Sequence, residues 1–120
     1  MNSGNYPQVI AEIGCNHKGD LDIALEMIKV AATFCDVDVI KFQKRDNRTL
    51  LSEIEFDKPH PVPKNSYGKS YGEHREYLEF NIEQHKLLAA ECKKFKKEYS
   101  TSVWDTVSAK EMIKLNPKCI

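Results

Sequence analysis

The sequence predicts an α/β protein built on a parallel sheet. Three stretches rich in β-branched, aromatic or hydroxyl-bearing residues, at 8–13, 37–42 and 99–102, read as strands, and each ends in polar or charged side chains. Apolar residues at three- and four-residue steps predict helices between and after them. Strands that alternate with helices form parallel sheets, and functional residues gather at the carboxyl ends of such strands. We therefore expect about three β/α units with a site at one edge.

The length of 120 residues fits one small domain. A closed (β/α)8 barrel needs about 250 residues. We therefore expect a flexible leader at 1–7, followed by an incomplete barrel domain at 8–120 that forms the N-terminal part of a larger protein.

Composition excludes several classes of function. Eighteen basic and eighteen acidic residues give a formal net charge of zero, so no long-range field attracts nucleic acid or an anionic membrane. The sequence has no signal peptide and no apolar run of the ~20 residues that a membrane span requires. Four cysteines without paired spacing indicate reduced thiols, and we expect a cytoplasmic protein. Cys35 and Cys92 are expected in the core, and the lysines at 93–97 on a solvated helix face.

The first strand places a carboxylate, Glu12, among apolar residues just before a glycine-containing turn. Burying a carboxylate is costly unless it meets a cation, a metal or a substrate hydroxyl. An ion pair with Lys41 and a role toward substrate are both open, and they are compatible. The helix that follows is expected to begin at an Asp20 N-cap and to end at Asp36, with an apolar face made of Ala24, Met27, Ile28, Ala31, Phe34 and Cys35.

The second strand, 37–42, is almost continuously apolar, which is typical of a parallel strand covered on both sides. Alternation directs Lys41 away from Ile40 and Phe42, to a face where its charge can hold a phosphate or a carboxylate. Gln43 shares that side and offers both a donor and an acceptor. A desolvated lysine can also form a Schiff base, and the residues alone leave this alternative open.

The segment 45–80 loses periodicity, and Pro59, Pro61 and Pro63 exclude a long regular element. Loops of this length inside compact domains are more often functional than idle, and we expect this one to fold over the site.

The rest of the chain predicts a helix, a strand and a helix. Asn81 and Gln84 form a capping box for the first helix, whose inner stripe continues through Leu88, Cys92, Phe95 and Tyr99. The short strand 99–102 presents the Thr101 hydroxyl, while Ser100 and Ser102 are expected to point elsewhere. The last helix places Ala109, Met112 and Ile113 on one face, and Pro117 ends it.

The first turn contains two further candidates. Cys15 has no evident partner base for a nucleophilic role. His17 is either a hydrogen-bonding structural residue or a metal ligand. The four histidines show no paired ligand spacing, so the sequence does not contain a complete metal site.

Four segments together closely resemble the N-acetylneuraminate (sialic acid) synthase family. They read IAEIGCNHKGD at 10–20, KFQK at 41–44, YGKSYGEHR at 67–75 and YSTS at 99–102. The resemblance implies a TIM-barrel enzyme of sialic acid-type biosynthesis. Such an enzyme condenses phosphoenolpyruvate with an open-chain N-acyl amino sugar, such as N-acetylmannosamine, and releases phosphate with the help of a divalent Mn²⁺ or Mg²⁺.

The resemblance also implies roles for matching residues. Glu12 and Lys41 would be catalytic, with Glu12 as an acid/base or orienting group. Lys41 and Thr101 would hold phosphoenolpyruvate, and Gln43 and Asn65 would contact the amino sugar. The Schiff-base alternative loses weight because the family's chemistry needs no imine.

The family's metal-binding histidines and its C-terminal antifreeze-like domain would lie beyond residue 120. The resemblance therefore implies metal ligands outside this chain, a homodimer of the full-length protein and no activity for the 120 residues alone. Two alternatives remain: a legionaminate, pseudaminate or other 3-deoxyulosonate synthase, and an inactive truncated fragment with only a structural or interaction role.

Overall fold

A single parallel sheet organises the chain. The computed structural model describes residues 6–120, so most of the expected leader lies outside the described residues. The strand order is β1-β2-β3, with both neighbouring pairs parallel, as predicted. The strands are β1 (Ile10–Gly14), β2 (Val39–Lys44) and β3 (Glu98–Val103).

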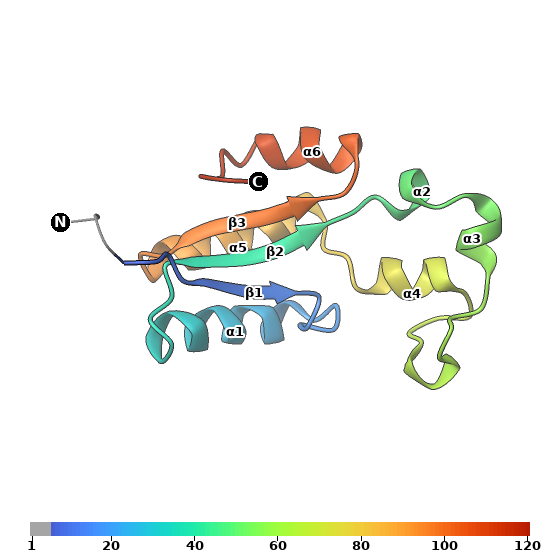
Figure 1. The fold of residues 1–120 in the computed structure, drawn as a ribbon, viewed down its shortest axis with the longest axis horizontal. Helices are drawn as coiled ribbons and strands as arrows, with labels where there is room; N and C mark the ends of the chain where they lie inside the picture. Colours follow the sequence, from blue (N-terminus) through green and yellow to red (C-terminus); the bar gives the residue numbers. More distant parts are fainter. Residues whose placement is uncertain (1–5) are drawn as a thin grey trace.

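Three longer helices accompany the strands (Figure 1): α1 (Leu21–Thr33), α5 (Ile82–Lys94) and α6 (Thr106–Ile113). Their predicted caps are confirmed. The Asp20 carboxylate accepts from the backbone N–H groups of Asp22 and Ile23, and Asn81 forms a reciprocal capping box with Gln84. These caps satisfy amides that the first helical turn leaves without partners.

The core lies between the sheet and these helices. Ile40 and Phe42 of the central strand β2 are fully buried there, together with helical residues such as Ile28 and Leu88. Cys92 is buried as predicted, whereas the prediction for Cys35 is wrong because that thiol is exposed. Helix α1 ends at Thr33, so the helical periodicity that would have carried Cys35 to the core stops two residues before it.

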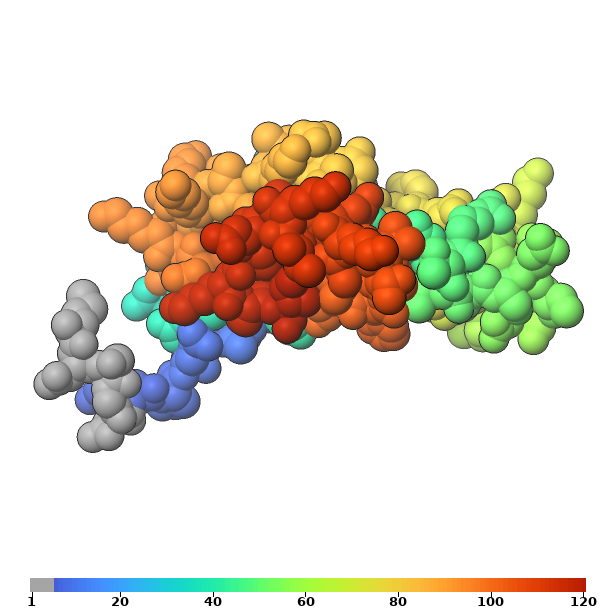
Figure 2. Space-filling view, turned by 90° about the horizontal axis from the view of Figure 1, so that it is seen from above, coloured from blue at the N-terminus to red at the C-terminus, as the bar shows by residue number. Residues whose placement is uncertain are grey.

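Residues 45–80 form an excursion between β2 and α5. It contains only short elements, as the prolines predicted: α2 (Asn47–Leu50), α3 (Glu53–Asp57), the 3₁₀ turn η1 (Pro63–Asn65) and α4 (Tyr71–Tyr77). The prediction that this segment folds over the site is wrong. Figure 1 places it beyond the carboxyl ends of the strands, and Figure 2 shows it projecting from one end of the molecule. The chain extends 52 Å along its longest axis.

Two buried histidines close the core. His17 is 2% exposed, its Nδ1 accepts from the Gly19 backbone N–H at 3.1 Å, and its ring stacks on Phe80. His85 of α5 is 0% exposed, and its Nδ1 lies 2.7 Å from the Tyr99 hydroxyl in a hydrogen bond. Burial lowers the pKa of His17 to about 4 and that of His85 to about 3. Both rings are therefore neutral at pH 7. The buried, hydrogen-bonded position of His17 favours the structural role of the two considered.

Within residues 6–120, no helix has the length and the apolar character that crossing a membrane would require.

We expect the free energy of unfolding to fall as the pH drops from 7 to 5. The folded-state pKa values of about 4 and about 3 lie below the ordinary histidine value of 6.5. At a pH between the folded-state value and 6.5, the unfolded chain therefore binds more protons than the folded chain. The stabilisation is complete above pH 6.5 and is lost as the pH falls. At pH 5 each histidine lowers the free energy of unfolding by on the order of 2 kcal/mol relative to pH 7.

Urea unfolding at pH 7, 6 and 5 measures this dependence. A His17→Asn variant should show a shallower slope with pH than the parent chain, whatever its stability at pH 7. A free energy of unfolding that does not change between pH 7 and pH 5 would contradict the conclusion that both histidines are buried and neutral.

Candidate active site

An ion pair joins the first two strands on the face that the helices leave open. Glu12 and Lys41 are direct neighbours in the β1–β2 register, and Lys41 Nζ lies 2.6 Å from Glu12 Oε2. Their side chains are 54% and 30% exposed, respectively. A pair this accessible contributes little to stability. Its importance is that it holds a cation and a carboxylate in fixed positions on an accessible surface, as the alternation along β2 predicted.

Gln43 lies two residues further along β2, on the same face as Lys41. Its Nε2 donates to the Sγ of Cys15, which belongs to the turn after β1. That turn begins with an irregularity in the strand register between Glu12 and Gly14, and Gly14 has a φ of +57°. A bulge of this kind redirects side chains at a strand end. The sheet thus brings three of the predicted site residues, Glu12, Lys41 and Gln43, to neighbouring positions on β1 and β2.

The β2–β3 register corrects the orientation expected for the third strand. Ser100 and Ser102 pair with Lys41 and Gln43, so the two serines share the open face. Thr101 pairs with Phe42 on the helix side, its side chain is 0% exposed, and its hydroxyl donates to the Ser102 carbonyl at 3.3 Å. From this buried position Thr101 does not reach a ligand on the open face.

The sequence contained the signal for this orientation. Tyr99 packs its ring into the core near Phe42 and His85, and two-residue alternation then sends Thr101 to the same side.

Asn65 ends the turn η1 in the excursion and is exposed. In the part of the chain that the structure describes, no hydrogen bond joins it to Glu12, Lys41 or Gln43. The structure therefore does not bring Asn65 to the other predicted residues.

Arg45 is a residue of this edge that the sequence reasoning missed. It directly follows β2 and forms an ion pair with Glu79, in which each side chain is only 10% exposed. Its backbone N–H also donates to Glu79 Oε2 at 3.1 Å, and its Nη2 donates to Cys15 Sγ at 3.3 Å. The guanidinium carbon lies 5.8 Å from the centre of the Trp104 ring, just after β3. Arg45 therefore connects segments that follow all three strands.

Burial raises the pKa of the Cys15 thiol, although the contacts with Gln43 and Arg45 act in the opposite direction. The thiol is therefore protonated at neutral pH. Since the thiolate is the nucleophilic form, Cys15 is poorly suited to nucleophilic chemistry.

A divalent metal does not fit the residues present. Within residues 6–120, no group of three or more histidine, cysteine, aspartate or glutamate side chains is arranged to hold a metal ion.

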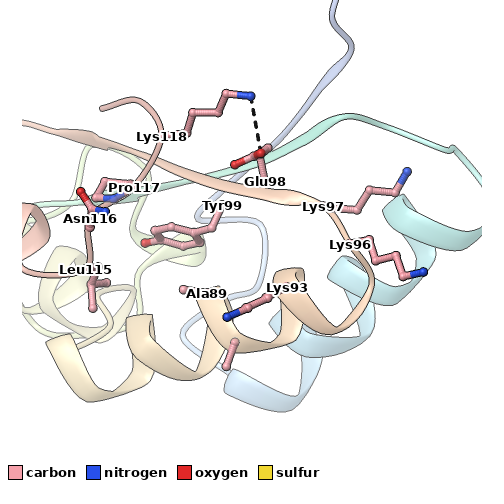
Figure 3. Close-up of a pocket in the computed structure, with 11 residues that line it drawn as sticks. Ala89, Lys93, Lys96, Lys97, Glu98, Tyr99, Leu115, Asn116, Pro117 and Lys118 are labelled. Carbon is pink, nitrogen blue, oxygen red and sulfur yellow. Dashed lines mark hydrogen bonds and ion pairs between the residues drawn. The ribbon is translucent and has the colours of Figure 1, made fainter. Parts of the chain in front are cut away.

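A hollow of about 570 Å³ lies elsewhere, between α5 and the segment 115–118 (Figure 3). It lies beside Tyr99 on the helix side of the sheet. Lys96 and Lys97 extend away from Tyr99, and Lys118 pairs with Glu98 at 3.5 Å. The prediction of lysines on a solvated helix face is correct for Lys93 and Lys94 only. Lys96 and Lys97 follow the end of α5, and the Lys97 side chain is 17% exposed and pairs with Asp36.

Comparisons with known proteins agree with this architecture. The NeuB family profile matches residues 27–120. N-acetylneuraminate-9-phosphate synthase of Mus musculus is 36% identical over 94% of the chain, which spans 31% of the mouse protein. N,N'-diacetyllegionaminic acid synthase of Campylobacter jejuni is 31% identical over 72% of the chain and 25% of that protein.

A solved structure supports the fold. N-acetylneuraminic acid synthetase of Leptospira borgpetersenii, crystallised with citrate, aligns with 98% of this chain and 39% of its own chain, at a TM-score of 0.70 and 23% identity. The three β/α units correspond to part of a TIM-type barrel. The chain spans about a third of the length of the curated relatives it matches, and it belongs to the NeuB family.

Proposed function

We propose that this chain forms the first wall of a synthase site that joins phosphoenolpyruvate to an open-chain N-acyl amino sugar. In this reaction C3 of phosphoenolpyruvate bonds to the aldehyde carbon of the sugar, water adds at C2, and C–O cleavage releases inorganic phosphate. The observation that carries the proposal is the Glu12–Lys41 pair beside Gln43 on the open face of the sheet.

Lys41 is the proposed phosphoenolpyruvate ligand. An ammonium is a compact point charge that suits a phosphate or carboxylate oxygen. Its side chain is 30% exposed, so an anion can approach it without disturbing the core. The carboxylate of Glu12, 2.6 Å away, orients the ammonium. As an acid/base group, Glu12 can also exchange a proton with the water or with the aldehyde oxygen.

Gln43 is the proposed contact for the amino sugar, because an amide can match both the donors and the acceptors of an N-acyl group. Asn65 stays a proposed contact that requires the excursion to approach the open face. For Thr101 the buried hydroxyl gives no support. Ser102 is the better placed hydroxyl on β3, because Ser100 is itself buried and its hydroxyl donates to the Cys119 carbonyl.

The relatives favour two acceptor classes. The mouse relative is named for a 9-phosphate product. Phosphoenolpyruvate contributes the first three carbons of a nine-carbon product, so a phosphate on C9 enters on C6 of the acceptor. The Campylobacter jejuni relative is named for a diacetylated product. A panel of N-acetylmannosamine, its 6-phosphate and a 2,4-diacetamido hexose, with mass spectrometry of the product, separates these candidates.

Replacing Lys41 with arginine should lower kcat/KM for phosphoenolpyruvate at least tenfold in the complete gene product. The planar guanidinium keeps the charge but places it differently from the ammonium. Phosphate release under steady-state conditions is the measurement.

The matched control is Lys29→Arg, since Lys29 is an exposed lysine on α1 whose side chain is 55% accessible. It should leave both kinetic constants unchanged. Near-normal turnover of the Lys41→Arg variant would show that Lys41 is peripheral to the reaction.

The 120 residues expressed alone should release no phosphate above the no-enzyme rate, because one wall of a site cannot surround the reacting atoms. The complete gene product, translated to its natural stop codon, should be active in the same assay. Turnover by the 120-residue chain would overturn the first expectation. An inactive complete product would favour the alternative of a fragment with only a structural or interaction role.

A further inference from the structure

We propose that Cys15 is a positioning residue that orients the amide of Gln43, so that Gln43 Oε1 accepts a hydrogen bond from the N–H of the acceptor's N-acyl group. The inference rests on the proposed function and extends it to a residue outside the resemblance-based site. It assigns the Cys15 thiol a task that needs no nucleophilic chemistry.

The contacts around the sulfur determine which end of the amide is free. Arg45 has only donors, so its approach to Cys15 Sγ at 3.3 Å uses a lone pair of the sulfur. Gln43 Nε2 donates to the same sulfur. With its nitrogen engaged there, the Gln43 side chain keeps its oxygen for another partner. An acceptor oxygen on this face recognises a donor such as the N–H of an acylated amino sugar.

The sulfur also accepts from Arg45, which is itself held by Glu79. Glu79 binds Arg45 through both the guanidinium and the backbone N–H, and the two charged side chains are only 10% exposed. Arg45 in turn contacts Cys15, which contacts Gln43. These contacts form a continuous series from the link between α4 and α5 to the open face of β2. Cys15 is the step in this series that connects the turn after β1 to β2.

The expected effects are modest because sulfur is a weak acceptor. In the complete gene product, Cys15→Ala should raise KM for the amino sugar about fivefold to tenfold, the size of one lost hydrogen bond. KM for phosphoenolpyruvate should not change. Cys15→Ser keeps an acceptor at the same position and should restore most of the lost affinity. Cys35→Ala, which removes an exposed thiol outside this network, is the matched control.

A double-mutant cycle tests whether Cys15 acts through Gln43. In a Gln43→Ala background, Cys15→Ala should have no further effect on KM for the sugar, because the amide that Cys15 orients is already gone. Additive effects of the two substitutions would overturn the inference. So would equal rises in KM for both substrates, which would indicate a general structural role.

Alkylation gives a readout that does not depend on turnover. The reaction is run at alkaline pH, because iodoacetamide reacts with the thiolate and the Cys15 thiol is protonated at neutral pH. Saturating amino sugar should slow the modification of Cys15 and leave that of Cys35 unchanged, as measured by peptide mass spectrometry. If the wild-type protein neither turns over nor protects Cys15, the proposed function itself fails. If it turns over while Cys15→Ala has wild-type KM values, only the present inference fails.

Discussion

The alternation of side chains along β2 is the constraint on which the rest of the structure depends. Ile40 and Phe42 are fully buried against the helices, so Lys41 and Gln43 must occupy the opposite face. A shift of one residue in register would bury the ammonium and expose the aromatic ring, and the cost of burying an unpaired charge excludes that shift. The same parallel register then sets the neighbours, with Glu12 on one side and Ser100 on the other.

This constraint separates the energetics of the fold from the chemistry of the site. Apolar burial on the helix side stabilises the sheet. The Glu12–Lys41 pair, with both side chains accessible, adds little to stability, since the strength of exposed pairs is limited by solvent and salt. Because the fold does not require this pair for stability, its two charges can interact with a ligand without destabilising the protein. The buried Arg45–Glu79 pair is the opposite case, because removing either partner would leave a poorly solvated charge.

Local patterns in the sequence predicted the strands, the main helices, two helix caps and the face of Lys41, because each depends on residues within a few positions of one another. The prediction for Cys35 failed where a helix ended earlier than its apolar stripe. Thr101 was assigned by resemblance, although the neighbouring Tyr99 already marked its face as the core. Arg45 was missed because its partner Glu79 is 34 residues away, and no periodicity connects the two.

The path of the excursion was equally beyond local patterns. Its proline-rich sequence excludes long helices and strands. The direction in which the excursion leaves the sheet is determined by long-range contacts, which local patterns do not reveal. Gly19 has a φ of +74° and no room for a Cβ beside the Tyr77 carbonyl oxygen, so the end of α4 lies against the turn after β1. Glu79, two residues later, binds Arg45 at the end of β2. The returning end of the excursion is thus attached to the edge that carries Cys15 and Gln43. The outgoing end is held as well, because the backbone N–H of Asp46 donates to Asp105 Oδ2 at 2.7 Å, just after β3. Both ends of the excursion are therefore fixed to the edge at which the strands end.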